Sequence, residues 1–210
     1  MTIDNQDNSG MITELKKASC ILRNGGLVAF PTDTLYALGA NVFDENAIGK
    51  VFAAKGRPKT MALPILLADS SDLDKVAIDV NKDVRNLIEA FWPGPLTLVL
   101  KKHKSISDIL TSGNDTVAVR MPNHRLALEL IKLTGIPLAG TSANISQGVD
   151  PTDASIVEKQ IGHNIDMILD GGVCPMQGAS TILDVTSTHP NLIRQGVLSS
   201  EKISKVVELN

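Results

Sequence analysis

Aromatic residues are scarce in this sequence, at 3% of its 210 residues, with one Trp and one Tyr. Proteins that bind single-stranded nucleic acids stack the bases on aromatic side chains, so this scarcity argues against that class. The formal net charge of −3 at pH 7 also argues against a protein whose whole surface neutralises phosphates. A local basic cleft is compatible with both observations.

Cysteine is scarce too, and long apolar runs are missing. The two cysteines, Cys20 and Cys174, have no partner at metal-ligand spacing. The first ten residues are polar and lack the apolar segment of a secretory signal. No apolar run reaches the length of a membrane span. We therefore predict a cytoplasmic protein with reduced thiols and no membrane contact.

The common catalytic motifs are absent as well. Gly49-Lys50 lacks the upstream glycine and the following Ser or Thr of a P-loop, and no dinucleotide fingerprint or zincin motif occurs. Residues 140–144, Gly-Thr-Ser-Ala-Asn, are similar to the Gly-x-Ser-x-Gly turn of hydrolases. Asn144 replaces the last glycine, however, and would crowd the sharp turn that exposes a nucleophile. The four histidines have no recurrent spacing, so we interpret them as surface residues and assign no metal ligand.

What the sequence does contain is an aliphatic core. Hydrophobic residues make up 43% of the chain and are mainly Leu, Ile, Val and Ala, which is typical of α/β domains with buried strands. After a flexible leader over residues 1–10, periodicity and turn residues predict one domain with a twisted, open, mixed sheet flanked by helices. The expected helices are 12–22, 44–54, 81–91, 124–134, 152–161 and 199–209. The expected strands are 27–30, 63–68, 96–100, 116–120, 137–140, 167–169, 180–185 and 191–194.

Hydroxyl groups and paired cations follow the first expected strand. The strand ends at Pro31, so Thr32, Asp33 and Thr34 come at a strand terminus, where open α/β sheets place their ligands. Lys55 and Arg57 follow a helix and precede a proline that stiffens the loop. This combination favours an anionic, phosphate-bearing ligand. A capped turn and a solvated helix end are the alternative.

Two further segments carry polar groups at strand ends. Arg120 ends the apolar run Val-Ala-Val, where an unpaired cation would be costly. It either holds a substrate carboxylate through its planar fork or forms a salt bridge to an internal Asp, and Arg194 has the same two interpretations. Ser142 and Asn144 offer a hydroxyl and an amide suited to phosphate oxygens or a ribose. A turn that only satisfies its own backbone is the alternative.

An ordered set of motifs covers the chain from about residue 25 to 198. The segments are Pro-Thr-Asp-Thr-Leu-Tyr-Ala-Leu-Gly-Ala, Lys-Gly-Arg-Pro, Trp-Pro-Gly-Pro-Leu-Thr, Val-Ala-Val-Arg-Met-Pro, Thr-Ser-Ala-Asn-x-Ser, Leu-Asp-Gly-Gly, Ser-Thr-Ile-Leu-Asp and Ile-Arg-Gln-Gly. Each is weak alone, but the ordered set is specific. It resembles the YrdC-like family of threonylcarbamoyl-AMP synthases, in its short, single-domain form.

The resemblance implies a YrdC-like domain over residues 11–210, built around a concave cavity that binds ATP, L-threonine and bicarbonate, with Mg²⁺ accompanying ATP. The family's ATP contacts fall on Lys55, Arg57, Thr116, Ser142, Asn144 and Arg194, with Lys55 and Arg57 as the catalytic cations. Its threonine contacts fall on Thr34, Arg120, Gly140 and Ser180. Two positions depart from the pattern: Ala37 replaces a glycine, and Leu66 replaces a histidine of many relatives.

The implied reaction makes the activated intermediate for threonylcarbamoyladenosine at position 37 of tRNA. A threonine carbamate would attack the α-phosphorus of ATP and expel pyrophosphate, with no protein nucleophile. The partners implied are the downstream tRNA threonylcarbamoyl transferase machinery and contact with tRNA or double-stranded RNA. Two alternatives are an RNA-binding protein without nucleotidyl transfer and a carbamoyl-transfer module. The acidic net charge and scarce aromatics oppose the first, and missing zinc-finger and acylphosphatase-like segments oppose the second.

Overall fold

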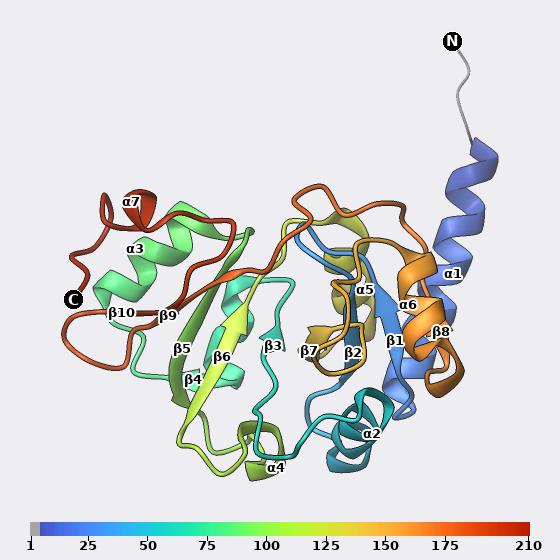
Figure 1. Cartoon of the computed structure of the whole chain (residues 1–210), viewed down its shortest axis with the longest axis horizontal. Coiled ribbons are helices and arrows are strands. Elements are labelled where there is room, and N and C mark those ends of the chain that lie inside the picture. Colours follow the sequence, from blue (N-terminus) through green and yellow to red (C-terminus); the bar gives the residue numbers. More distant parts are fainter. Residues whose placement is uncertain (1–4) are drawn as a thin grey trace.

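A single open β-sheet with strands of both directions organises the chain (Figure 1). The computed structural model describes residues 5–210, with side chains described from residue 9 onward. The strand order is β10-β9-β5-β6-β3-β7-β2-β1-β8, and β4 pairs with β5 off this path. The strands are β1 Val28–Phe30, β2 Ala37–Asn41, β3 Ile65–Leu66, β4 Ala77–Ile78, β5 Leu96–Lys102, β6 Thr116–Arg120, β7 Leu138–Ser142, β8 Met167–Ile168, β9 Thr181–Asp184 and β10 Asn191–Arg194.

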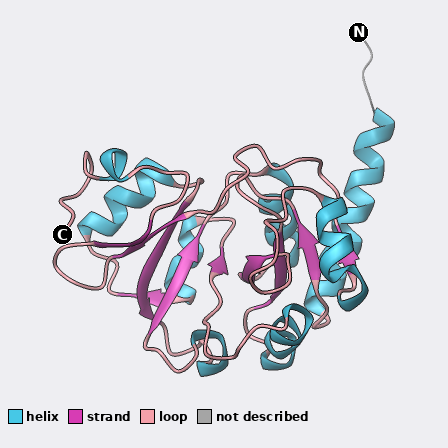
Figure 2. Ribbon diagram, viewed as in Figure 1, coloured by secondary structure: helices cyan, strands magenta, loops and turns pink. Residues whose placement is uncertain are grey.

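Helices lie around the sheet (Figure 2). They are α1 Asn5–Arg23, α2 Glu45–Lys55, α3 Lys82–Phe91, α4 Asp108–Thr111, α5 Arg125–Thr134, α6 Ala154–Ile161 and α7 Ser200–Ile203, with 3₁₀ helices η1 Ser70–Lys75 and η2 Gly162–Asn164. Several begin at a side-chain cap: Asp44, Asn81 and Asp153 each accept a backbone N–H of the first helical turn. None of the helices in the described part of the chain is both long and apolar enough for a membrane span.

The fold class predicted from the sequence is confirmed, while some boundaries are wrong. The first helix begins at Asn5, so residues 5–10 of the predicted leader form its first turns, and residues 1–4 lie outside the described residues. The strand expected over 63–68 is only Ile65–Leu66. The closing helix, expected over 199–209, is only Ser200–Ile203. β2 and β4 are strands that periodicity did not predict.

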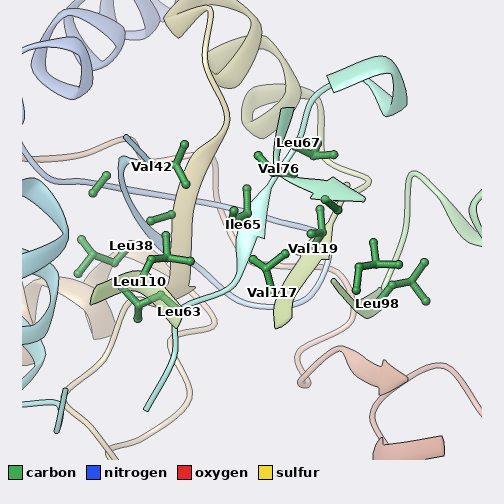
Figure 3. Packing of buried hydrophobic residues seen from close by; sticks show 14 of the residues in the cluster. Leu38, Val42, Leu63, Ile65, Leu67, Val76, Leu98, Leu110, Val117 and Val119 are labelled. Carbon is green, nitrogen blue, oxygen red and sulfur yellow. The ribbon is translucent and has the colours of Figure 1, made fainter. Parts of the chain in front are cut away.

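The core has two parts because side chains alternate across the strands. On β1, Ala29 belongs to the larger cluster, whereas Val28 and Phe30 belong to the smaller one, which packs against α1 and α5. The larger cluster lies on the other side of the sheet. Within it, Ile65 of β3 and Val119 of β6 are paired neighbours (Figure 3).

The pairing of strands brings distant motifs together. β2 runs antiparallel to both β1 and β7, with Ala37 opposite Phe30 on one side and Ser142 on the other. The end of β1, the start of β2 and the end of β7 therefore lie side by side, where these strands end. β3 lies between β6 and β7, which places Leu66 beside Arg120. The loops that connect to these strand ends form the site.

Candidate functional site

A cavity of about 410 Å³ lies where these strands end. Three arginines line it, Arg57, Arg120 and Arg194. The predicted residues Thr34, Gly140, Ser142 and Ser180 line it as well. Another cavity, of about 500 Å³ and bordered by Trp92, contains no predicted site residue. The cavity of about 410 Å³ is the candidate site because the predicted arginines and hydroxyl groups line it.

Arg120 is a buried cation with an acceptor on each of its nitrogens. Only 6% of the residue is exposed. Nε donates to the Gly94 carbonyl oxygen at 2.9 Å, Nη1 donates to the Thr34 hydroxyl at 2.7 Å, and Nη2 is paired with the Asp33 carboxylate. Burial lowers the pKa of Arg120, and the charge of Asp33 opposes that shift. The internal salt bridge that the sequence left open is therefore present.

The same guanidinium also faces the cavity. It has five N–H donors, and three of them are engaged in these contacts. One N–H on each Nη atom has no partner among the described residues. Two N–H groups on neighbouring nitrogens can bind one carboxylate. The structural ion pair and a ligand contact are thus compatible with each other.

The Thr34 hydroxyl is held in place by its neighbours. The Thr32 hydroxyl donates to the Leu35 carbonyl oxygen at 2.7 Å, and its oxygen lies 3.0 Å from the Thr34 hydroxyl oxygen. Thr34 accepts a hydrogen bond from Arg120 Nη1 at 2.7 Å. One lone pair of the Thr34 oxygen is left for a ligand, so this hydroxyl can accept an N–H or O–H from a substrate.

Arg194 and Ser180, which both line the cavity, are joined by hydrogen bonds. The register between β9 and β10 shifts between Leu192 and Arg194, which is a local irregularity that re-aims a side chain. Arg194 donates through Nε and Nη2 to the Ser180 carbonyl oxygen, at 3.2 and 2.8 Å. The Ser180 hydroxyl also contacts Thr97, at 2.9 Å. Gly196 permits this close crossing, because a Cβ there would lie 2.3 Å from the Ala179 carbonyl oxygen.

Lys55 lies behind the cavity and does not line it. It is 2% exposed, and its ammonium donates to the Ser142 carbonyl oxygen and to the carbonyl and side-chain oxygens of Asn144, the latter two at 2.6 and 3.2 Å. All three N–H groups are therefore in use. Burial and the nearby Arg57 lower the pKa of Lys55 to about 8. Lys55 fixes the loop at Ser142 to Asn144.

The loop that Lys55 holds is closed by its own side chains. The Ser142 hydroxyl donates to Asn144 Oδ1 at 2.7 Å, and Asn144 Nδ2 donates to the Gly148 carbonyl oxygen at 3.0 Å. Ser142 lines the cavity, whereas Asn144 does not. The self-satisfying turn that the sequence allowed is present, and it presents Ser142 at the cavity wall.

Arg57 and Thr116 have different positions relative to the cavity. Arg57 lines it while Nε and Nη2 donate to the carbonyl oxygens of Met61 and Ala62, at 3.0 and 2.9 Å. Thr116 is on the same face of β6 as Ala118 and Arg120, which line the cavity, but it lies at the far end of that strand and outside the lining. The ATP contacts predicted for Lys55, Asn144 and Thr116 stay predictions.

Leu66 and Gly140 form a tight contact in the wall. A Cβ added at Gly140 would lie 2.5 Å from Leu66 Cδ1, so only glycine fits beside this leucine. Both residues line the cavity. Gly140 is buried, with its N–H donating to the Pro64 carbonyl oxygen at 2.8 Å, and Leu66 makes the wall apolar. Leu66, which replaces a histidine of many relatives, is therefore part of the site.

Sequence reasoning missed one carboxylate, did not identify the partner of another, and misplaced one histidine. Asp150 lines the cavity, and its charge opposes the lowering by burial of the pKa of Arg194. It follows a Gly-Val segment that carried no motif. Asp33 was noticed in its motif, but its pairing with Arg120 depends on tertiary structure. His124 was expected at the surface, yet its Nδ1 atom is buried without a partner among the described residues.

Comparisons with known proteins agree with this geometry. The model of the Sua5/YciO/YrdC family, described as telomere recombination, matches residues 20–196. A threonylcarbamoyl-AMP synthase of Pyrococcus abyssi is 45% identical over 92% of this chain and 57% of its own length. The Bacillus subtilis protein of that name is 40% identical over 92% of the chain and 56% of its own. The chain thus spans little more than half the length of these two relatives.

A solved structure gives the same result in three dimensions. The P. abyssi Sua5 protein complexed with L-threonine superposes with a TM-score of 0.92 at 44% sequence identity. The match covers 93% of this chain and 58% of that one.

Proposed function

The chain belongs to the Sua5/YciO/YrdC family, and on this premise we propose that it is an L-threonylcarbamoyladenylate synthase, a nucleotidyltransferase. It would form threonylcarbamoyl-AMP and pyrophosphate from L-threonine, bicarbonate and ATP. The product would serve the threonylcarbamoyladenosine modification of tRNA. Relatives named for this activity at 45 and 40% identity support the proposal.

The observation that carries the proposal is the convergence of three arginines with hydroxyl groups in one cavity. Arg57, Arg120 and Arg194 line the same cavity as the hydroxyls of Thr34, Ser142 and Ser180. Arg120 donates to the Thr34 hydroxyl, and Arg194 donates to the Ser180 carbonyl oxygen. Such a cavity suits two anionic substrates, one with a carboxylate and one with phosphates. The cocrystal of a relative with L-threonine agrees with the first.

On the threonine side, the proposal assigns each polar group of the substrate a partner in the cavity. Arg120 would hold the substrate carboxylate through its two unengaged N–H groups. Thr34 would accept a hydrogen bond from the substrate hydroxyl or amine. Ser180 and the backbone at Gly140 would contact its other polar groups. Alignment of this kind lowers the barrier because it removes the entropy cost of bringing reactants together.

The bond changes require no nucleophile from the protein. Bicarbonate releases CO₂ and hydroxide, and the threonine nitrogen adds to the carbon of the CO₂. One proton of that nitrogen passes to the hydroxide, which leaves the carbamate and water. A carbamate oxygen then attacks the α-phosphorus, and the bond to the bridging oxygen breaks to release pyrophosphate. Arg57 and Arg194 would stabilise the charge on the phosphoryl oxygens. Lys55 would act behind them by holding the loop that presents Ser142.

The cavity is compatible with Mg²⁺ that enters with ATP. Mg²⁺ is commonly bound by one or two carboxylates together with substrate phosphates. Asp150 supplies a carboxylate in the cavity lining, and the described residues contain no group of three or more potential metal ligands. Asp150 would therefore hold the ion jointly with the nucleotide. The ion, when bound, offsets phosphate charge.

The product is an activated acyl adenylate, so the proposal implies a partner that consumes it. We propose that this partner is the tRNA threonylcarbamoyl transferase machinery. Contact with tRNA or double-stranded RNA would accompany that step. A cavity of about 410 Å³ lined by apolar residues and three arginines is more suited to nucleotides than to a long duplex.

Pyrophosphate release from ATP tests the proposal. The chain with ATP and Mg²⁺ should release pyrophosphate only when threonine and bicarbonate are both added. Arg57→Ala is the matched loss-of-function control, because it alters the cavity without touching the buried Arg120 cluster. Equal release of orthophosphate with neither cosubstrate would contradict the proposal.

A further inference from the structure

We propose that Asp33 is a positioning residue that aims the Arg120 guanidinium at a substrate carboxylate, and thereby makes the cavity select an amino acid that carries one. This inference rests on the proposed function, since it concerns how the threonine end of that site is built. Asp33 itself does not line the cavity. Any effect on the substrate must therefore pass through Arg120.

Asp33 is fixed in place by its own loop. It is 2% exposed, and its carbonyl oxygen accepts the Met176 N–H at 3.0 Å. The turn around it is closed by the Thr32 hydroxyl, which accepts the backbone N–H groups of Thr34 and Leu35 at 3.1 and 3.3 Å. A carboxylate on such a turn has a defined position. It can act as a rigid reference for the cation beside it.

Arg120 is oriented by three acceptors from two separate segments. Gly94 precedes β5, whereas Thr34 and Asp33 belong to the loop between β1 and β2. A planar guanidinium held at all three nitrogens cannot rotate about its terminal bonds. Its two unengaged N–H groups, one on each Nη, then keep a constant direction. Of the three contacts, the charged one with Asp33 is the strongest type.

One oxygen of Asp33 makes no contribution to stability through hydrogen bonding. Oδ2 is buried and has no partner within the described part of the chain. An unsatisfied buried acceptor destabilises the folded state. Such exceptions in folded proteins call for a functional explanation. Only Oδ1 of Asp33 is needed to aim Arg120. A positioning role therefore explains why a carboxylate is present although its Oδ2 atom is unpaired.

An alternative role for Asp33, as a neutralising charge only, predicts the opposite change in threonine affinity. If Asp33 served only to neutralise Arg120, it would repel the incoming carboxylate, and removing its charge would tighten threonine binding. If Asp33 aims Arg120, removing the charge loosens the guanidinium and weakens binding. The sign of the change in threonine affinity therefore separates the two roles.

The test compares threonine with threoninol, which has a CH₂OH group in place of the carboxylate. Calorimetry on the full chain measures the Kd of both compounds, and of ATP, for the wild type and for Asp33→Asn. Asp108→Asn is the matched control, because it removes a carboxylate paired with Lys102 outside the cavity. We expect threonine to bind about tenfold or more weaker to Asp33→Asn, equivalent to about 1.4 kcal/mol. Threoninol and ATP should bind within twofold of the wild type.

Three binding results would overturn the inference. An equal loss for threonine and threoninol would mean that Asp33 only supports the fold, and a tighter threonine complex would mean that it only neutralises Arg120. Threonine binding that Asp33→Asn leaves unchanged would mean that Asp33 has no effect on the substrate. If the wild-type chain binds no threonine, the proposed function itself fails, which is distinct from these three results.

Nitrogen-detected NMR on the wild-type chain gives a second test, which does not need Asp33→Asn to fold. The Nη protons of Arg120, assigned by their loss in Arg120→Lys, should give separate signals because rotation is blocked. Averaged signals in the wild type would show a freely rotating guanidinium and overturn the inference, whatever the substrate.

Discussion

The ammonium of Lys55 lies 2.6 Å from the carbonyl oxygen of Asn144, at the back of the cavity wall. Lys55 is the last residue of α2, and Asn144 follows β7, so this contact joins a helix end to a strand end. It changes the role expected of Lys55. The lysine is predicted to position the loop, whereas Arg57, two residues later, faces the ligand.

Replacing these two cations should therefore give different kinetic results. Lys55→Met keeps the length of the side chain but leaves buried carbonyl oxygens without donors, so we expect a lower melting temperature together with slower turnover. Arg57→Ala should cost on the order of 10² or more in rate, as for one preorganised donor, with little loss of stability. Thermal melts and initial rates measured side by side check both. Equal melting and equal activity of the two variants would refute the division of roles.

The pH dependence of stability should show the buried Lys55. Its pKa is lowered from 10.5 to about 8, so between these values the unfolded chain holds a proton that the folded chain has released. The contribution of Lys55 to the free energy of unfolding therefore rises with pH across this window and is constant below it. The melting temperature of the wild type minus that of Lys55→Met should rise from pH 8 to 10. A flat difference would contradict the shift.

Activity should change in the opposite direction over the same window. A neutral Lys55 has two N–H donors for three acceptors, so the loop at Ser142 loses one contact. We expect turnover of the wild type to fall above pH 8 while its stability gains from this group.

Arg120→Lys should weaken threonine binding and also lower stability. A lysine keeps the charge beside Asp33 but has no planar fork, and it leaves the Gly94 carbonyl oxygen without its donor. We expect at least tenfold weaker threonine binding, unchanged ATP binding, and a loss of about 1–3 kcal/mol in the free energy of unfolding. Calorimetry and denaturant unfolding of the same preparation measure these quantities. Intact threonine affinity would remove Arg120 from the site.

The contact between Gly140 and Leu66 predicts a paired rescue. Gly140→Ala puts a Cβ 2.5 Å from Leu66 Cδ1, so this variant should bind threonine poorly. Leu66→Ala removes the obstructing atoms, and the double variant should recover part of the lost affinity, as expected for residues in direct contact. Additive losses in the double variant would show that the two positions are independent.

The sequence predicts much of this fold because local signals and tertiary packing agree. Asp44, Asn81 and Asp153 cap the helices that the periodicity predicts. β2 was missed because Ala37 to Asn41 has little β-branched or aromatic character. Its neighbours β1 and β7 stabilise it as a strand.

The site was predictable as a set of residues but not as a set of roles. Motif order identified the arginines and hydroxyls that line the cavity. The direction of a side chain depends on which segments meet, and these are far apart in sequence. Asp33 and Arg120 illustrate this, being 87 positions apart. For the same reason, Lys55 was predicted to contact the ligand but does not line the cavity, whereas Asp150 was not predicted and does line it.

The central claim is that one adenylate contains both cosubstrates. The most direct measurement is to incubate the chain with ATP, Mg²⁺, threonine and carbon-labelled bicarbonate, and to identify the labelled product by mass spectrometry. Our account predicts one labelled adenylate whose mass includes AMP, threonine and the carbonyl carbon from bicarbonate. An adenylate of threonine alone, without the label, would contradict it.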